Sequence, residues 1–292
     1  MSDAPLAAAL YIVATPIGNL EDITLRALRV LKEAAVIACE DTRQTQKLLN
    51  HFGIATKTVS YHEHNEAQRA AELIVKLEGG EPVALVTDAG TPGVSDPGYR
   101  IIQLAIRHRL PVVPVPGPSA IVSALIGSGL PTDDFRFGGF LPAKHGQRRT
   151  VLESVRDAGS TLIFYEAPHR IVETLEDIIE IMGGERKIVI ARELTKVHEE
   201  FLRGDADKVF EDLRHRQGGV KGEITLLIAA GETQLERTKV RPAERLAVIM
   251  RDNQLDEKAA LKLLAKEMGV SKSEAYREIQ RTASGPTGHG SR

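Results

Sequence analysis

The stretch from Thr87 to Gly98 reads TDAGTPGVSDPG, and it follows Val83–Val86, an apolar run typical of a buried strand. Its three glycines, two prolines and two aspartates exclude a helix or strand interior, because these residues favour turns and special backbone conformations. A helix-like segment begins near Pro97. Open α/β folds hold their ligands in such loops, at the carboxyl ends of strands. We therefore predict a ligand site here; the alternative is a long connection without a ligand.

The first half of the chain alternates apolar strand-like runs with amphipathic helical segments. The predicted strands cover residues 10–14, 36–39, 58–61, 83–86 and 111–115, and the longer helices cover 66–77 and 99–108. This alternation predicts an α/β fold with a largely parallel sheet covered on both faces. After a turn at Thr15–Asn19, we expect Asp22 to cap the first helix.

The second half has a different order of elements. Strands are predicted at residues 135–140, 161–165, 187–192, 197–203 and 223–230, with helices at 170–182 and 205–215. Two strands between about 187 and 203 follow each other without a helix, which indicates an antiparallel pair and a mixed sheet. The turn Pro116–Ala120 suits a domain junction. We therefore divide the body into an N-terminal α/β domain, residues 1–117, and a C-terminal α/β domain, residues 118–232.

Residues 240–282 are predicted to form a small helical extension. Asp256 can cap one helix, and Ser271–Glu274 is a capping box for the last. Three short helices with a turn before the last resemble a helix-turn-helix, and a small helical cap packed on the body is the alternative. In the helix-turn-helix reading, the side chains that could reach phosphates are Lys272, Arg277 and Arg281.

Charge is unevenly distributed along the chain. Residues 233–292 carry 12 Lys and Arg against 8 Asp and Glu, a net charge of +4, whereas the whole chain has a net charge of −2. A basic C-terminal part on an acidic body suggests an anionic partner for that part. The last residues, 283–292, contain little to bury and are predicted to be disordered.

The composition is that of a soluble globular protein. The chain has 292 residues, of which 42% are hydrophobic and 27% charged, enough for a sizeable core. No run of about 18 apolar residues occurs, so we expect no membrane span, and the N-terminus lacks the basic region of a signal peptide. The single cysteine, Cys39, suits a reducing cytosol and a cytoplasmic location, and we expect it in the core rather than as a nucleophile.

Three loops follow predicted parallel strands and should converge on one crevice: Thr15–Asn19, Thr87–Gly98 and Pro116–Ala120. None contains a lysine, and neither GxxxxGK[ST] nor GxGxxG is present, which disfavours ATP and an ordinary dinucleotide. What remains is a ligand with a cationic or neutral head. S-adenosylmethionine fits, because its sulfonium tolerates carbonyl and carboxylate oxygens.

Seven motifs in order give the sequence a family resemblance over about residues 10–281. They are ATPIGNLEDIT, ACEDTRQTQKLL, TDAGTPGVSDPG, PGPSA, FYEAPHR, ARELTKVHEE and GEITLLI. In them the chain resembles the tetrapyrrole-methylase superfamily, and within it the branch that methylates small-subunit ribosomal RNA. The resemblance implies two α/β domains, a homodimer, S-adenosylmethionine in the cleft between the domains, and methylation of a cytidine 2′-hydroxyl group in the decoding region of 16S rRNA or the 30S subunit.

The same resemblance assigns candidate residues to the cofactor site, motif by motif. The cofactor-binding candidates are Pro16, Asp88, Ala89, Gly90, Thr91, Val94, Ser119, Ala120, Tyr165, Glu166 and Ala191. The chain departs from the corrin-making branch in two places: its first loop lacks the GxGPGD run, and its second loop reads AGTP where that branch has GGDP. Both departures disfavour a tetrapyrrole substrate.

A ribose hydroxyl group is a weak nucleophile, so a side chain that accepts its proton would help methyl transfer. Glu40 and Asp41 are one candidate pair for this catalytic role, and Glu166 and His169 are another. The alternative for the first pair is structural, with Asp41 capping the next helix and Glu40 pairing with Arg43. The resemblance does not decide between these roles.

Basic side chains in the motif loops could hold RNA phosphates, although surface ion pairs are an equal alternative for them. These candidates are Arg43, Arg170, Arg192 and Lys196. The pair His62 and His64 could bind a metal ion, but no third ligand follows from the spacing, so no metal is expected. Two rival functions stay open: a methylase of a tetrapyrrole or another small molecule, and a non-catalytic RNA-binding protein that uses its C-terminal helices.

Overall fold

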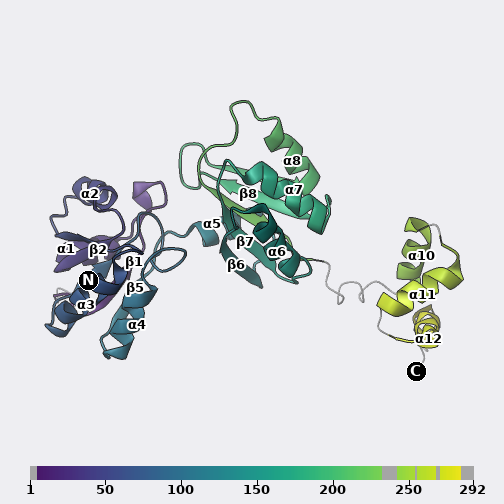
Figure 1. The fold of residues 1–292 in the computed structure, drawn as a ribbon, viewed down its shortest axis with the longest axis horizontal. Coiled ribbons are helices and arrows are strands. Elements are labelled where there is room, and N and C mark those ends of the chain that lie inside the picture. The colour runs from purple at the N-terminus through teal and green to yellow at the C-terminus, as the bar shows by residue number, and fades with distance from the viewer. Residues whose placement is uncertain (1–4, 232–241, 254, 268–269, 284–292) are drawn as a thin grey trace, which may run out of the picture. The chain divides into compact units, whose positions relative to one another are not determined.

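The computed structural model describes residues 5–231, 242–253, 255–267 and 270–283 (Figure 1). The chain forms two compact units, and the two sheets belong to the first. The first sheet has five parallel strands in the order β3-β2-β4-β1-β5. Its strands are β1 (Leu10–Val13), β2 (Val36–Cys39), β3 (Thr58–Ser60), β4 (Val83–Leu85) and β5 (Val112–Val115). The predicted parallel sheet is confirmed.

Helices cover both faces of this sheet because successive strand residues point to opposite sides. Tyr11 and Val13 pack with residues of α1 (Leu25–Glu33) and α2 (Thr42–His51). On the other face, Leu10 and Ile12 pack with α3 (Glu66–Glu78) and α4 (Tyr99–Arg107). The strands are therefore buried on both sides, and their carboxyl ends carry the loops of the site. Cys39 lies in this core, as expected.

The second sheet is mixed, with the order β6-β7-β10-β8-β9. Its first pair is parallel and the other three are antiparallel, which confirms the predicted mixed sheet. Its strands are β6 (Phe135–Phe140), β7 (Thr161–Glu166), β8 (Lys187–Arg192), β9 (Glu200–Asp205) and β10 (Ile224–Ile228). Its helices are α6 (His145–Val155), α7 (Ile171–Met182) and α8 (Ala206–Arg214).

The helix α5 (Ala120–Ser128) follows the turn after β5 and packs on the second sheet. Its Ala124 and Leu125 share an apolar cluster with Ile163 of β7 and Val189 of β8. Ile17, from the loop after β1, joins the same cluster. Side chains of the first loop and of the second sheet are therefore packed together, and this packing fixes the walls of the site.

One predicted helix start is wrong. Residues Leu20–Asp22 form a short 3₁₀ turn, η1, so Asp22 does not cap the first helix. Thr24 caps α1 instead, because its Oγ1 accepts a hydrogen bond from the amide of Ala27 at 3.1 Å. Asp and Thr both occur often as N-caps, but Asp22 lies within the 3₁₀ turn, so the helix begins after Thr24.

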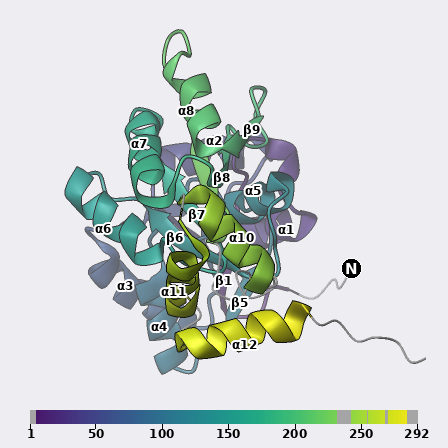
Figure 2. The same cartoon turned by 90° about the vertical axis from the view of Figure 1, so that its right-hand side faces the viewer.

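Among the described residues, the second compact unit contains three helices, coloured yellow-green to yellow in Figure 1 and Figure 2. They are α10 (Pro242–Asp252), α11 (Glu257–Glu267) and α12 (Lys272–Ala283), and they share an apolar core. The predicted caps are confirmed: Asp256 accepts from the amide of Ala259 at 2.7 Å, and Ser271 and Glu274 bond reciprocally. The predicted disordered tail lies outside the described residues, apart from Ala283, which ends α12.

Within the described part of the chain, no helix is long and apolar enough to cross a membrane. The described residues also contain no group of three or more His, Cys, Asp or Glu side chains arranged to hold a metal ion. The rings of His62 and His64 lie edge to face at 5.9 Å.

Candidate active site

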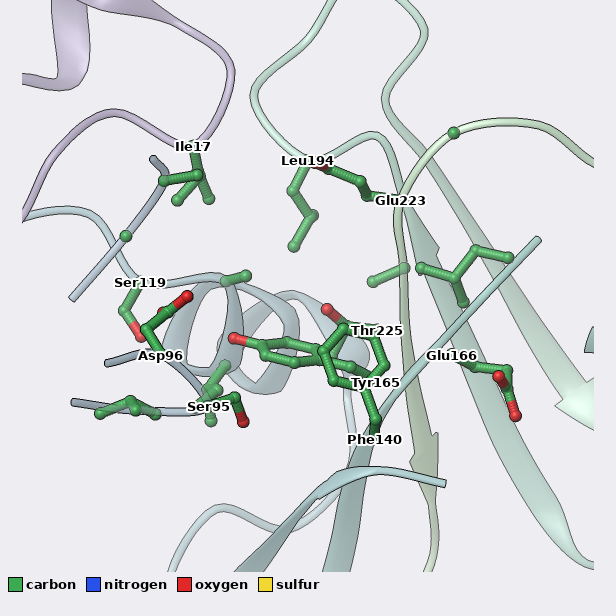
Figure 3. Close-up of a pocket in the computed structure, with 18 of the residues that line it drawn as sticks. Ile17, Ser95, Asp96, Ser119, Phe140, Tyr165, Glu166, Leu194, Glu223 and Thr225 are labelled. Carbon is green, nitrogen blue, oxygen red and sulfur yellow. The ribbon is translucent and has the colours of Figure 1, made fainter. Parts of the chain in front are cut away.

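A cavity of about 500 Å³ opens where the loops of the first sheet meet the second sheet (Figure 3). All three predicted loops contribute to its lining, through Ile17, the segment Asp88–Thr91 and Ser119. The opposite wall comes from the carboxyl end of β7 and from Ala191 and the start of β10. A volume of this size suits a ligand as large as a nucleoside derivative.

Hydrogen bonds join the first two loops directly. Thr15 and Gly90 exchange two backbone hydrogen bonds, at 2.9 and 3.0 Å, and the Thr15 hydroxyl group donates to the carbonyl oxygen of Thr87 at 3.0 Å. Gly90 has φ of +82°, a conformation that side-chain-bearing residues rarely adopt. The glycine is therefore needed for the backbone shape that closes this side of the cavity.

Ten of the eleven predicted cofactor-binding residues line the cavity, and Pro16 is the exception because the next residue, Ile17, takes that place. Sequence reasoning missed several further lining residues. The largest or most polar of them are Ser95, Asp96, Phe140, Leu194, Glu223 and Thr225. Asp96 lies in the loop already singled out, so it carried a signal, whereas Phe140 and Thr225 come from strands and carried none.

Among the described residues, the cavity lining contains four carboxylate residues and no Lys, Arg or His. The carboxylate residues are Asp88, Asp96, Glu166 and Glu223. Arg170 pairs with Glu166 and Lys196 pairs with Glu223, so two of the four carboxylates are neutralised from outside the lining. Asp88 and Asp96 have no ion pair among the described residues, and their charge disfavours a polyphosphate and favours a ligand with positive charge. The absence of lysine from the three loops thus extends to all described residues of the cavity lining.

Asp96 extends into the cavity, and the hydroxyl end of Tyr165 points toward it from the opposite wall (Figure 3). Burial raises the pKa of Asp96 to about 6, with the hydrogen bond to Thr87 acting in the opposite direction and the charges of Glu40 and Asp88 adding to the rise. Burial also raises the pKa of Tyr165 to about 12, so its hydroxyl group stays protonated. Asp96 can therefore accept a proton near neutral pH, and Tyr165 can donate a hydrogen bond.

Glu166 is the next residue along β7, and its carboxylate turns away from the cavity (Figure 3). Oε1 accepts hydrogen bonds from the Ala167 amide and the Arg170 guanidinium, at 2.7 to 3.0 Å, and Oε2 accepts one from Thr174 at 2.7 Å. Its side chain is 0% exposed. All of these partners lie in β7, α7 or the segment between them, so the carboxylate anchors α7 to the strand.

Glu40 and Asp41 lie behind the second loop and do not line the cavity. Asp41 caps α2 and holds Arg43 through two side-chain hydrogen bonds, and these bonds lower the pKa of Asp41 to about 2. Burial raises the pKa of Glu40, whose Oε2 is 3.5 Å from the Thr87 hydroxyl group. The Asp41 amide donates to Asp88 at 3.2 Å. The pair therefore supports the loop from outside, and Arg43 pairs with Asp41 rather than Glu40.

The predicted RNA-binding side chains of the body differ in accessibility. Arg170 pairs with Glu166, Arg192 with Glu200, and Lys196 with Glu193 and Glu223. Arg43 is 88% exposed despite its bond to Asp41. Lys272 and Arg277 are exposed on α12, and the Arg281 side chain lies outside the described ones. His169 is exposed.

The protein is an α/β protein with two five-stranded sheets, and a cavity lined by carboxylate residues lies at the loops of the first sheet. Residues 9–209 match the family Tetrapyrrole (Corrin/Porphyrin) Methylases. The chain belongs to this family. It is 49% identical, over 91% of its length and 93% of the relative's, to a Halalkalibacterium halodurans protein named ribosomal RNA small subunit methyltransferase I. A protein of the same name from Escherichia coli O157:H7 is 43% identical over 92% of this chain and 93% of its own.

Solved structures show the same fold at low sequence identity. Diphthine synthase matches with a TM-score of 0.60 and 16% identity, over 75% of this chain and 89% of its own. Uroporphyrin-III C-methyl transferase from Thermus thermophilus, complexed with S-adenyl homocysteine, matches with a TM-score of 0.52 and 20% identity, over 76% of this chain and 97% of its own. The fold predicted from the motifs is confirmed.

Proposed function

We propose that this protein transfers the methyl group of S-adenosylmethionine to the ribose 2′-hydroxyl group of a cytidine in the decoding region of 16S rRNA. The observation that carries the proposal is the cavity: its described lining residues include no cation and two carboxylates, Asp88 and Asp96, that no ion pair among the described residues neutralises. The names of the relatives, which cover almost the whole chain at 41–49% identity, support rRNA as the substrate.

The residues present fit this cofactor. A sulfonium cation is stabilised by Asp88 and Asp96, whose carboxylates have no ion pair among the described residues, and the glycine turn at Gly90 brings backbone close to the cavity. We assign the cofactor to the wall formed by Asp88–Thr91, Val94, Ser119 and Ala120, between the two domains proposed from the sequence. The cofactor supplies an electrophilic methyl group.

The chain's own contribution is positioning and proton acceptance. A hydroxyl oxygen that attacks a methyl carbon must lie in line with the bond that breaks, so rigid walls supply much of the rate. The proton of that hydroxyl group has to leave, and Asp96 is the half-buried carboxylate that extends into the cavity. We therefore prefer Asp96 to Glu40, Asp41 and Glu166 as the proton acceptor.

RNA also has to be held by its phosphates, and the cavity lining offers no cation for them. We propose that the C-terminal helices supply this contact through Lys272 and Arg277 of α12, together with Lys258, Lys262 and Lys266 of α11. The three lysines are four residues apart and exposed, so they form one stripe, while Ala260, Leu261 and Leu264 face the apolar core.

We further propose a homodimer. Val122 and Ile126 of α5 are large apolar side chains left exposed, and burial of such a surface between two copies would be favourable. Light scattering on the purified protein tests this, and a monomer at micromolar concentration would contradict it.

The decisive experiment offers the purified protein S-adenosylmethionine labelled in the methyl group, with three acceptors in parallel. These are 30S subunits, protein-free 16S rRNA and uroporphyrinogen. We expect label in rRNA, at one cytidine, on the ribose rather than the base, as read by nucleoside mass spectrometry. Label in the porphyrinogen alone would contradict the proposal and indicate a small-molecule methylase instead.

A second measurement separates enzyme from binding protein. Calorimetry should show cofactor binding by the full chain. If the protein bound RNA but no cofactor, and lost RNA binding when residues 242–283 were deleted, the non-catalytic rival would replace our proposal.

A further inference from the structure

Phe140 is the last residue of β6, an edge strand of the second sheet, and the residue is 60% exposed. It nevertheless lines the cavity, and its ring lies 5.3 Å from the Tyr165 ring, centroid to centroid, at a tilt of 57° (Figure 3). Phe137 holds Tyr165 from a second side at 5.0 Å. The chain has few aromatic residues, 4% in all, so this gathering beside one cavity is notable.

A strand irregularity is what brings Phe140 to the cavity. Phe137 pairs with Ile163, and Phe140 pairs with Tyr165, so β6 advances by three residues over a stretch in which β7 advances by two. In a regular strand, Phe140 would pair one position later, opposite Glu166, and would point to the α7 face with it. The extra residue makes a bulge that turns Phe140 to the face of Tyr165.

The bulge depends on two glycines. Gly139 has φ of +71°, in the left-handed region. A Cβ atom on Gly138 would lie 2.2 Å from the Phe164 ring, which is too close for any side chain. The sequence therefore uses Gly138-Gly139 to aim an aromatic ring at the cavity while leaving much of that ring in water, an arrangement that apolar burial within the chain does not explain.

A partly exposed aromatic ring beside a nucleotide-sized cavity suits a nucleobase. Proteins that recognise single-stranded RNA stack unpaired bases on aromatic side chains, and enzymes that modify a nucleotide in RNA must bring it out of its stack. The residues assigned to the cofactor in the proposed function lie on the loop wall. Phe140 belongs to the second-sheet wall, together with the sequence candidates Tyr165, Glu166 and Ala191, and remains exposed. Lys144, four residues later in the chain, is exposed and has no ion pair among the described residues, so its charge is available to an RNA phosphate.

We propose that Phe140 is the stacking platform for the base of the nucleotide that is methylated, with Tyr165 bracing its ring from behind. This inference rests on the proposed function, because it takes an RNA nucleotide as the acceptor. It makes Phe140 a substrate-positioning residue.

Two alanine variants test the proposal, with S-adenosylmethionine and a transcribed 16S fragment that spans the decoding region. Phe135→Ala is the matched control, because Phe135 lies on the same edge strand, is 44% exposed and does not line the cavity. We expect Phe140→Ala to raise the KM for RNA about tenfold or more while the cofactor Kd stays within twofold, and Phe135→Ala to change neither. Equal RNA KM values in the two variants would overturn the proposal, and so would a weakened cofactor Kd in Phe140→Ala.

A tryptophan variant gives a readout besides activity. The chain contains no Trp, so Phe140→Trp and Phe135→Trp each place a single fluorophore on β6. We expect oligocytidylate to quench the emission of Phe140→Trp and not that of Phe135→Trp. If the wild type did not methylate rRNA but oligocytidylate still quenched Phe140→Trp, the proposed function would be wrong and the stacking role of Phe140 would stand. If rRNA were methylated but no quenching occurred, the proposed function would stand and the stacking role would be wrong.

Discussion

The two walls of the cavity each contain a carboxylate residue, but the two carboxylates have different surroundings. The loop wall carries Asp96, a carboxylate with no cation beside it in the lining and a pKa raised to about 6. The strand wall carries Glu166, a carboxylate saturated by Arg170, Thr174 and a backbone amide. A carboxylate next to a cavity is therefore a candidate proton acceptor only when its oxygens are not already occupied by hydrogen bonds and ion pairs within the fold.

The largest effect on activity is expected from replacing Asp96, the carboxylate of the loop wall. Asp96→Asn removes the proton acceptor, so we expect methyl transfer at pH 8 to fall by about 100- to 10,000-fold, while cofactor binding by calorimetry is retained. In the wild type, the rate should rise with pH through about 6, since only the ionised carboxylate accepts a proton. A variant with more than a tenth of the wild-type rate would remove Asp96 from that role.

The same substitution should stabilise the fold, with a sign set by the raised pKa. The folded protein holds the Asp96 proton more tightly than the unfolded chain does, so wild-type stability falls as pH rises from about 4 through about 6. Asn carries no charge and avoids that loss. The melting temperature of Asp96→Asn relative to wild type should therefore increase between pH 4 and 7, as measured by scanning calorimetry, and a constant difference would contradict this.

The strand wall's carboxylate should behave in the opposite way. Glu166→Ala leaves Arg170, only 17% exposed, without its buried partner, so we expect a loss of about 3 kcal/mol in the free energy of unfolding. The methyl-transfer rate per folded molecule should change less than tenfold. Urea unfolding and single-turnover rates measure the two quantities, and a large rate loss at unchanged stability would return Glu166 to the catalytic candidates.

Backbone shape is the loop wall's other feature, and Gly90→Val tests it. Valine is strained at φ of +82°, and we expect the cofactor Kd to rise about tenfold or more, with the fold kept. Gly80→Val is a matched control, because Gly80 has φ of +85° but lies outside the cavity lining. Equal losses of cofactor affinity in both variants would mean that Gly90 matters only for general backbone strain.

The contrast between the walls also shows what the sequence could predict. The glycine-rich loop was recognisable because its composition is a local property, and the order of strands and helices followed from apolar periodicity. The role of Glu166 was obscured because the predicted strand ended at residue 165, which left Glu166 in a loop. Once β7 extends to Glu166, strand alternation places Tyr165 and Glu166 on opposite faces.

Two features of the site depend on contacts distant in the sequence. The raised pKa of Asp96 comes from its burial and from Glu40 and Asp88, which only the folded sheet brings near it. The position of Phe140 depends on a bulge defined by pairing with β7. Neither burial nor register can be read from local composition. Phe140 was therefore absent from the predicted site, whereas Asp96 lay in the predicted loop without being recognised as a buried carboxylate.

The smallest expected effects concern the part of RNA that neither wall can hold. Because the cavity lining has no cation, phosphate contacts have to come from elsewhere, and α12 and α11 offer exposed basic side chains. We expect Lys272→Ala and Arg277→Ala each to weaken RNA binding a few-fold and to lower the salt slope by about one, and the triple Ala variant of Lys258, Lys262 and Lys266 to lower it further. Arg107→Ala, which removes an exposed charge from α4, serves as the control. Filter binding at salt concentrations from about 50 to about 200 mM measures these slopes. Slopes equal to that of the control would leave the C-terminal helices without a phosphate-binding role, whereas the cofactor assignment, which depends on the cavity lining, would be unaffected.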